Sequence, residues 1–107
     1  MITKELLDIK VTTKANIYWN GKVVSRTCYR KDGSKFTLGI ITTGTYTFDV
    51  GDKEVVSLIA GEAEIILPDE TEWRVVKTPD VFEIPAHSKY QIRTPEVVEY
   101  LCDYIPD

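Results

Sequence analysis

The sequence has few of the residues on which metal binding and covalent catalysis usually depend. Its 107 residues include two cysteines and one histidine. Cys28 and Cys102 lie far apart in the sequence, which is typical of small buried hydrophobic residues in a reducing compartment. Two thiols and one imidazole are too few to predict a zinc site. No serine or cysteine has an adjacent base that would mark it as a nucleophile.

Long apolar runs and dense basic runs are also missing. The uninterrupted apolar stretches are far shorter than the ~20 residues that span a bilayer. The first residues show neither the apolar core nor the cleavage site of a secretory signal. The net charge is -4, whereas proteins that bind nucleic-acid backbones neutralise many phosphates with Lys and Arg. We therefore expect a cytoplasmic protein that binds neither membranes nor nucleic acids.

What the chain does have is a series of short segments with strand periodicity. Glu62, Glu64 and Ile66 alternate with Ala63, Ile65 and Leu67, a period of two. Turn signals such as Asp32-Gly33 separate the segments. The predicted strands are 22–29, 36–42, 45–50, 54–60, 62–67, 73–76, 81–84, 90–93 and 97–105.

This spacing predicts a single all-β domain, either a sandwich or a closed barrel. We place the barrel at residues 18–107. Residues 1–17 are predicted to be an N-terminal extension that forms an edge strand or a dimer arm.

Two segments carry a more specific pattern. In residues 54–65 a strand with Glu54 enters a turn at Gly61, which resembles the second half of the first cupin motif. Residues 80–90, with a corner beginning at Pro85, resemble the second cupin motif. The resemblance implies a cupin-type jelly-roll barrel. The histidines of metal cupins would fall at 47–50 and at Tyr90, so the resemblance implies no bound metal.

A closer resemblance covers residues 18–105. The segments that carry it are 21–23, 44–48, 67–69, 85–88 and 100–104. They resemble the pyrimidine/purine nucleoside phosphorylase family of small cupins, although Ala86 replaces the usual glycine of the corner. The resemblance implies a homodimer that cleaves many nucleosides with inorganic phosphate as co-substrate. The products would be a free base and (deoxy)ribose 1-phosphate, with no metal or organic cofactor.

Phosphorolysis develops positive charge at the anomeric carbon, and this chemistry suggests roles for specific residues. Glu54 is expected to bind ribose hydroxyls or offset that charge, and His87 to protonate the leaving base or bind phosphate. A broad-specificity enzyme would hold its bases by stacking, for which the candidates are Tyr46, Phe48, Tyr90, Tyr100 and Tyr104. The phosphate candidates are Lys22, Lys35, Arg93 and Ser88, with help from Ser25.

Each candidate also has a purely structural interpretation. The aromatic residues could fill the interior, the basic residues could be solvated, and His87 could occupy a corner with unusual backbone angles. Trp73 is a candidate lid or dimer-interface anchor. Two other functions stay open: a non-catalytic cupin that binds a sugar or nucleotide, and a metal-dependent isomerase or dioxygenase.

Overall fold

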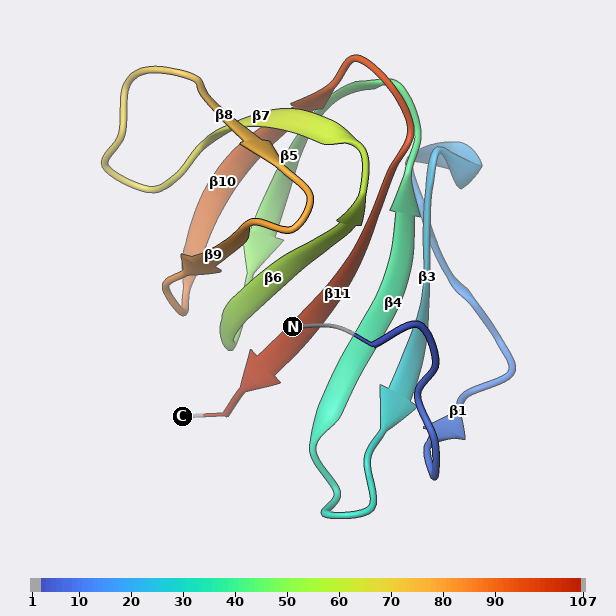
Figure 1. Cartoon of the computed structure of the whole chain (residues 1–107). Helices are drawn as coiled ribbons and strands as arrows, with labels where there is room; N and C mark the ends of the chain where they lie inside the picture. Colours follow the sequence, from blue (N-terminus) through green and yellow to red (C-terminus); the bar gives the residue numbers. More distant parts are fainter. Residues whose placement is uncertain (1–2, 107) are drawn as a thin grey trace.

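The structure, a computed structural model, describes residues 3–106 as two packed antiparallel β-sheets (Figure 1). The elements are β1 (Lys10–Val11), β2 (Asn16–Tyr18), η1 (Trp19–Gly21), β3 (Val23–Tyr29), β4 (Lys35–Ile41), β5 (Gly44–Val50), β6 (Lys53–Ala60), β7 (Glu62–Ile66), β8 (Arg74–Lys77), β9 (Val81–Ile84), β10 (Ser88–Thr94) and β11 (Val98–Ile105). The larger sheet has the order β1-β3-β4-β11-β6-β9, with β2 also paired to β3. The smaller sheet has the order β5-β10-β7-β8.

All nine predicted strands are present, with their ends displaced by a residue or two. The prediction of an all-β chain is therefore confirmed. The sequence pattern missed β2, whose Asn16 and Tyr18 pair with Ser25 and Val23 along the outer edge of β3. This pairing matters because β2 carries polar side chains to the site described below.

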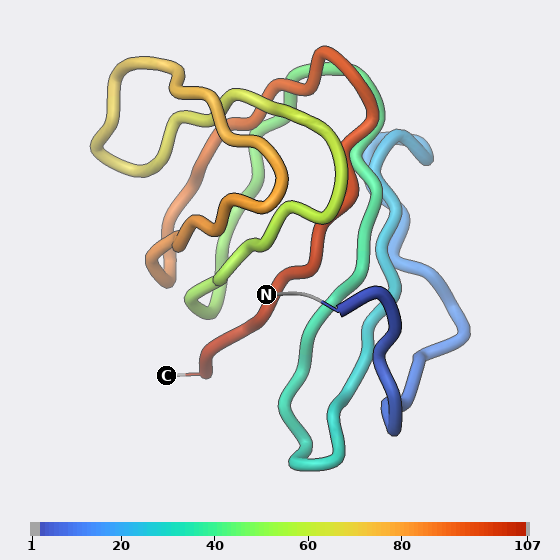
Figure 2. Tube along the Cα trace, viewed as in Figure 1, coloured from blue at the N-terminus to red at the C-terminus, as the bar shows by residue number. Residues whose placement is uncertain are grey.

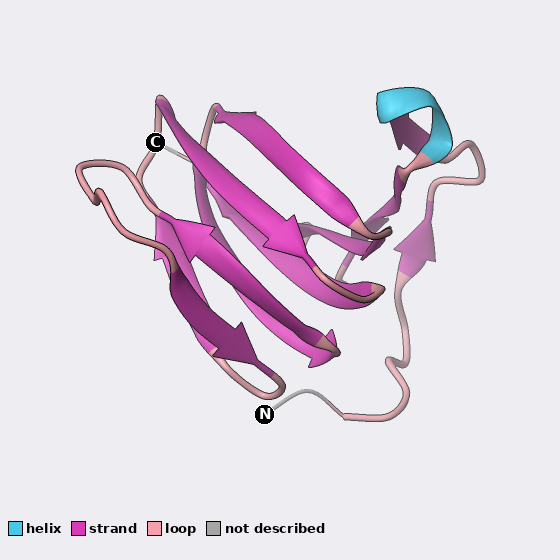
Figure 3. Cartoon of the chain, turned by 90° about the horizontal axis from the view of Figure 1, so that it is seen from above, coloured by secondary structure: helices cyan, strands magenta, loops and turns pink. Residues whose placement is uncertain are grey.

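The core lies between the two layers, which are seen edge-on in Figure 3. Because side chains alternate along a strand, each sheet turns one set of residues inward. Ile65 and Ile92 of the smaller sheet and Ile84 and Val98 of the larger sheet are almost completely buried there. One end of this interior is packed by aliphatic residues, and the other end carries the polar and aromatic groups of the site.

The N-terminal segment lies against the outer face of the larger sheet. Leu6 and Ile9 pack on a second buried cluster formed by Cys28, Phe36 and Leu101. Figure 2 shows the dark-blue segment alongside the cyan hairpin of β3 and β4. Within residues 3–106 no helix is long and apolar enough to cross a membrane.

Candidate functional site

A cavity of about 420 Å³ opens between the two sheets. Side chains from β2, β3, β4, β5, β6, β10 and β11 line it, so strands that are distant in sequence build one site. Cavities that hold small organic ligands measure roughly 300–1,000 Å³. This cavity therefore has the size of a small-molecule site.

Aromatic rings form one side of the cavity. Phe48 on β5 and Tyr90 on β10 are cross-strand neighbours, and their rings stack with centroids 5.7 Å apart. Tyr100 and Tyr104 on β11 also line the cavity, because they share the inward parity of that strand. Such flat faces suit a planar heterocycle.

Glu54 on β6 is the acid at the centre of the site. It is half-buried, and the Cys102 thiol donates a hydrogen bond to its Oε1 over 3.5 Å. Burial raises the pKa of Glu54 above its ordinary value, and the Cys102 hydrogen bond opposes this only in part. Cys102 was expected to be a small core hydrophobe, but it also contacts this carboxylate.

The phenols around Glu54 stay protonated across the physiological pH range. Burial is the largest cause that raises the pKa of Tyr90, Tyr100 and Tyr104, and the nearby Glu54 charge raises all three further. Burial likewise raises the pKa of the Cys102 thiol. The cavity thus presents neutral hydroxyl donors beside the Glu54 carboxylate.

A row of polar side chains extends from Tyr104, the cross-strand partner of Glu54, across the larger sheet toward β2, and we call it the hydroxyl wall. It consists of Asn16, Ser25, Thr27, Thr37 and Tyr104. Asn16 Nδ2 donates to Ser25 Oγ (3.2 Å) and to Thr27 Oγ1 (2.9 Å). Thr37 Oγ1 lies 3.2 Å from Tyr104 Oη in a shared hydrogen bond. Lys35 stands at the end of the wall, with its Nζ 4.6 Å from the centre of the Tyr104 ring.

The structure brings seven of the predicted site residues into this cavity: Glu54, Phe48, Tyr90, Tyr100, Tyr104, Lys35 and Ser25. Tyr46 shares the parity of Phe48 but lies deeper, buried in the core. Its hydroxyl donates to the Thr42 carbonyl over 3.0 Å, and its ring centroid is 6.2 Å from that of Phe48. Tyr46 therefore supports the aromatic side from behind rather than lining it.

The other predicted residues lie outside the cavity lining. Lys22 is exposed beside η1 and Trp19. His87 is exposed at the corner with a φ of 56°, and its backbone N–H donates to the Gly51 carbonyl over 2.8 Å. Ser88 Oγ donates back to the Pro85 carbonyl over 2.6 Å.

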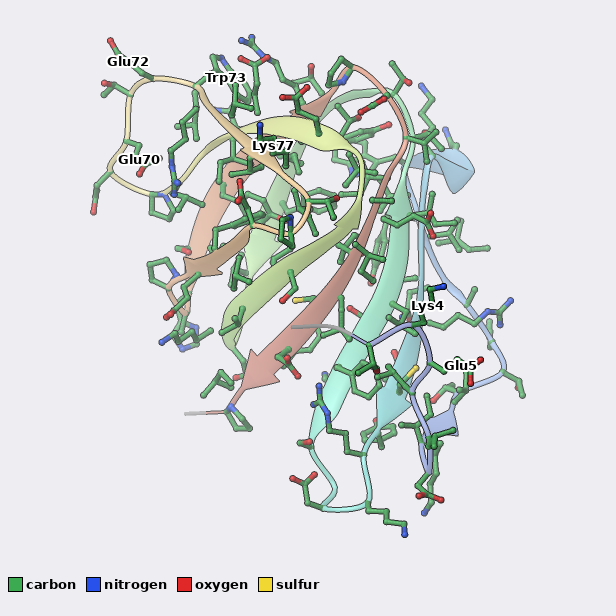
Figure 4. All side chains as sticks on the ribbon, viewed as in Figure 1. Lys4, Glu5, Glu70, Glu72, Trp73 and Lys77 are labelled. Atoms are coloured by element: carbon green, nitrogen blue, oxygen red, sulfur yellow. The ribbon has the colours of Figure 1, made fainter. Side chains whose placement is uncertain are left out.

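Arg93 points away from the cavity, because its neighbours Ile92 and Thr94 point inward. Its guanidinium makes two hydrogen bonds to Glu64, of 2.9 and 3.1 Å, and lies 4.2 Å from the ring centre of Trp73. The Glu64 contact raises the pKa of Arg93 and lowers that of Glu64. Figure 4 labels Trp73 in the loop between β7 and β8. Arg93 thus braces this loop on the outer face of the smaller sheet.

Sequence reasoning missed Asn16, Thr27 and Thr37. A signal for two of them was present: Ser25 and Thr27 share the parity of Val23, and Thr37 shares that of Ile41, so hydroxyls stand at inward positions. Asn16 gave no such signal, because its strand was not predicted. Among residues 3–106, no three His, Cys, Asp or Glu side chains gather closely enough to hold a metal ion.

The solved structures that the chain resembles define its fold class. A protein of unknown function from Acinetobacter sp. ADP1 superposes with a TM-score of 0.94 at 30% identity, covering 96% of this chain and all of its own. A cupin superfamily protein from Desulfitobacterium hafniense superposes with a TM-score of 0.65 at 20% identity, over 79% of this chain and 78% of its own. The fold is a cupin barrel, as predicted.

The particular family follows from the sequence comparisons. The family model for pyrimidine/purine nucleoside phosphorylase matches residues 13–104. A protein of that name from Wolinella succinogenes is 41% identical over 98 residues, 92% of this chain and 93% of its own. Another from Leptospira borgpetersenii is 38% identical over 102 residues, 95% of this chain and 98% of its own. The chain belongs to the pyrimidine/purine nucleoside phosphorylase family, and the predicted resemblance is confirmed.

The raised pKa of Glu54 predicts a pH-dependent loss of stability. Between the ordinary value of 4.5 and the raised value, the native protein holds a proton that the unfolded chain has released. Stability therefore falls as the pH rises through this window. The Glu54→Gln variant lacks this titrating group and should not lose stability in this way. Its free energy of unfolding should therefore rise relative to that of the wild type from pH 4 toward neutrality, and the difference should then level off. Urea unfolding across this range measures it, and a flat difference would contradict the raised pKa.

Gly39 makes room for the Tyr100 ring. The two residues are cross-strand partners, and a Cβ at position 39 would overlap the ring and hydroxyl of Tyr100. Gly39→Ala should lower the free energy of unfolding by about 1–3 kcal/mol, the usual effect of overpacking. Gly51→Ala is the control, because a Cβ there meets nothing within 4 Å. Equal stability of the two variants in urea unfolding would show that Tyr100 does not need this space.

Proposed function

We propose that this protein is a nucleoside phosphorylase of broad base specificity, and that the cavity around Glu54 is its active site. The observation that carries the proposal is the pairing of a half-buried carboxylate with stacked aromatic faces in one ligand-sized cavity. Family membership supports the reaction class. Stacking on Phe48 and Tyr90 supports broad specificity, because every base has a π-face.

In the proposed reaction, the bond between C1′ of the ribose and the base nitrogen breaks, and its electron pair leaves with the base. A phosphate oxygen forms the new bond to C1′. The proton gained by the base nitrogen balances the one that dihydrogen phosphate loses. The products are the free base and ribose 1-phosphate, or its deoxy analogue.

Glu54 suits the role of stabilising the transition state. Positive charge develops on the ribose as the base departs, and a carboxylate held in a partly desolvated site interacts strongly with it. The neutral phenols of Tyr90, Tyr100 and Tyr104 offer donors to the ribose hydroxyls or to the base. The proposed mechanism does not use His87 as the acid, because its side chain lies outside the cavity lining.

The purified protein should release base from uridine, inosine and adenosine only when inorganic phosphate is present. Chromatographic detection of base and of ribose 1-phosphate measures this. Glu54→Gln should lower kcat by about a hundredfold, the typical effect of removing one electrostatic stabiliser. Glu62→Gln, which changes an exposed carboxylate on β7, is the matched control. Base release that is equal with and without phosphate would contradict the assignment as a phosphorylase. Ligand binding without turnover would favour a sugar or nucleotide sensor.

We also propose that two copies of the chain associate through the outer face of the larger sheet. Ile40, Ile59 and Val81 are exposed there, and they line an apolar groove of about 1,140 Å³. Contiguous exposed apolar surface of this kind is typical of interfaces. Arg26 and Glu99 also line the groove, so opposite charges on one surface can pair across a two-fold axis.

Ile40→Asp should convert a dimer into a monomer, because it buries an unpaired charge in the interface. Light scattering after size-exclusion chromatography measures the mass at micromolar concentration. Val75→Asp is the matched control, since Val75 is an exposed apolar residue on the smaller sheet. A wild-type monomer, or a dimer that Ile40→Asp leaves intact, would show that this face is not the interface.

A further inference from the structure

The hydroxyl wall is a continuous array of donors. Its contacts run from Ser25 to Asn16, from Asn16 to Thr27, and from Thr37 to Tyr104. Thr27 and Thr37 join the two halves, because they face each other across β3 and β4. All five residues line the cavity.

Asn16 sets the direction of two hydroxyl protons. Its Nδ2 donates to Ser25 Oγ and Thr27 Oγ1, so each hydroxyl accepts from the amide. Each hydroxyl keeps one proton, which must seek another acceptor. Ser25 also hydrogen-bonds Tyr100, another residue of the cavity lining, whereas the Thr27 proton can be donated to an acceptor in the cavity. Tyr104 and Thr37 share one hydrogen bond, and the Tyr104 hydroxyl also hydrogen-bonds the Cys102 sulfur, which is a weak acceptor.

Charge favours an anion at this side of the cavity. Lys35 is the one cationic side chain among the described residues that line the cavity. The acids Asp49, Asp52 and Glu54 lie on β5, on β6 and in the turn between them. An anion is therefore attracted toward Lys35 and repelled from the acidic side.

We propose that the hydroxyl wall and Lys35 form the binding site for inorganic phosphate, with Asn16 as the positioning residue for its hydroxyl donors. This assignment rests on the proposed function, and it replaces Lys22, Arg93 and Ser88 as phosphate ligands. A tetrahedral oxyanion accepts several hydrogen bonds at once, which matches an array of hydroxyl donors beside one ammonium group. The ribose then lies between the phosphate and Glu54, and the base stacks on Phe48 and Tyr90.

Steady-state kinetics separates this site from the rest of the cavity. Lys35→Met should raise the KM for phosphate about tenfold or more, the loss expected for one charge-assisted hydrogen bond, and leave the nucleoside KM within about twofold. Asn16→Asp should raise the phosphate KM by about tenfold, because a carboxylate accepts the two hydroxyl protons instead of directing them into the cavity. Asn16→Leu removes the amide without adding an acceptor, so its effect should be smaller, about threefold.

Lys77→Met is the matched control. Lys77 is an exposed lysine at the end of β8, labelled in Figure 4. Its substitution should leave the KM values for phosphate and for the nucleoside unchanged. Unchanged phosphate KM values in Lys35→Met and Asn16→Asp would overturn the site while leaving the phosphorylase assignment in place. A phosphate KM that rises more in Asn16→Leu than in Asn16→Asp would also overturn the site.

Phosphate binding without turnover gives a second, independent measurement. Calorimetric titration of the resting protein with inorganic phosphate should show binding that Lys35→Met weakens about tenfold or more. If Lys35→Met weakens phosphate binding but the wild type releases no base, the phosphate site is supported and the proposed function is wrong. A parallel titration uses a nucleoside 5′-monophosphate, which carries the same oxyanion chemistry. Saturable binding of the monophosphate alone, with none of inorganic phosphate, would overturn the proposal.

Discussion

The organisation of the site depends on the partial burial of the Glu54 carboxylate. Removing a carboxylate from water is costly unless other groups bind it, and the hydrogen bond that Glu54 receives within the protein comes from a thiol, a weak donor. Burial raises its pKa, and burial together with the Glu54 charge raises the pKa of the surrounding phenols. A ligand with hydroxyl groups supplies the hydrogen-bond donors that the carboxylate lacks, and a ligand with developing positive charge supplies a compensating charge. The carboxylate is thus unfavourable for stability and is available to such a ligand in the cavity.

The barrel separates opposite chemistries across one small volume. Along the cavity the acids lie on β5, on β6 and in their turn, whereas Lys35 and most of the hydroxyl wall lie on β2, β3 and β4, with Tyr104 of β11 between them. The stacked rings of Phe48 and Tyr90 belong to the smaller sheet. A nucleoside and phosphate have complementary parts, a planar base, a hydroxylated sugar and an oxyanion, and the three regions match these parts. No single strand could provide this separation, because each strand contributes only alternate residues to the interior.

The sequence predicted most of the strands and a large part of the site, for reasons visible in particular residues. Glu54 and Tyr90 stand at motif positions of the cupin resemblance, and Phe48, Tyr100 and Tyr104 follow from strand parity. Arg93 has the charge of a phosphate ligand, but Ile92 and Thr94 turn inward on β10, so its side chain lies on the outer face. His87 is the single histidine, yet it lies at an exposed corner with positive φ. Residue type suggests what chemistry a side chain can do, but not whether it reaches the cavity.

By itself, the sequence predicted nine of the strands and their order along the chain, because period-two alternation and turn residues are local properties. The tertiary structure decided which inward residues meet. Asn16 contacts Ser25 and Thr27 only because β2 pairs with the edge of β3, and Tyr100 lies over Gly39 only because β11 pairs with β4. These are long-range pairings, and their energies depend on strand register and on the packing of one sheet against the other. The hydroxyl wall therefore depends on how the strands pair in the folded barrel, and it cannot be predicted from the individual strands.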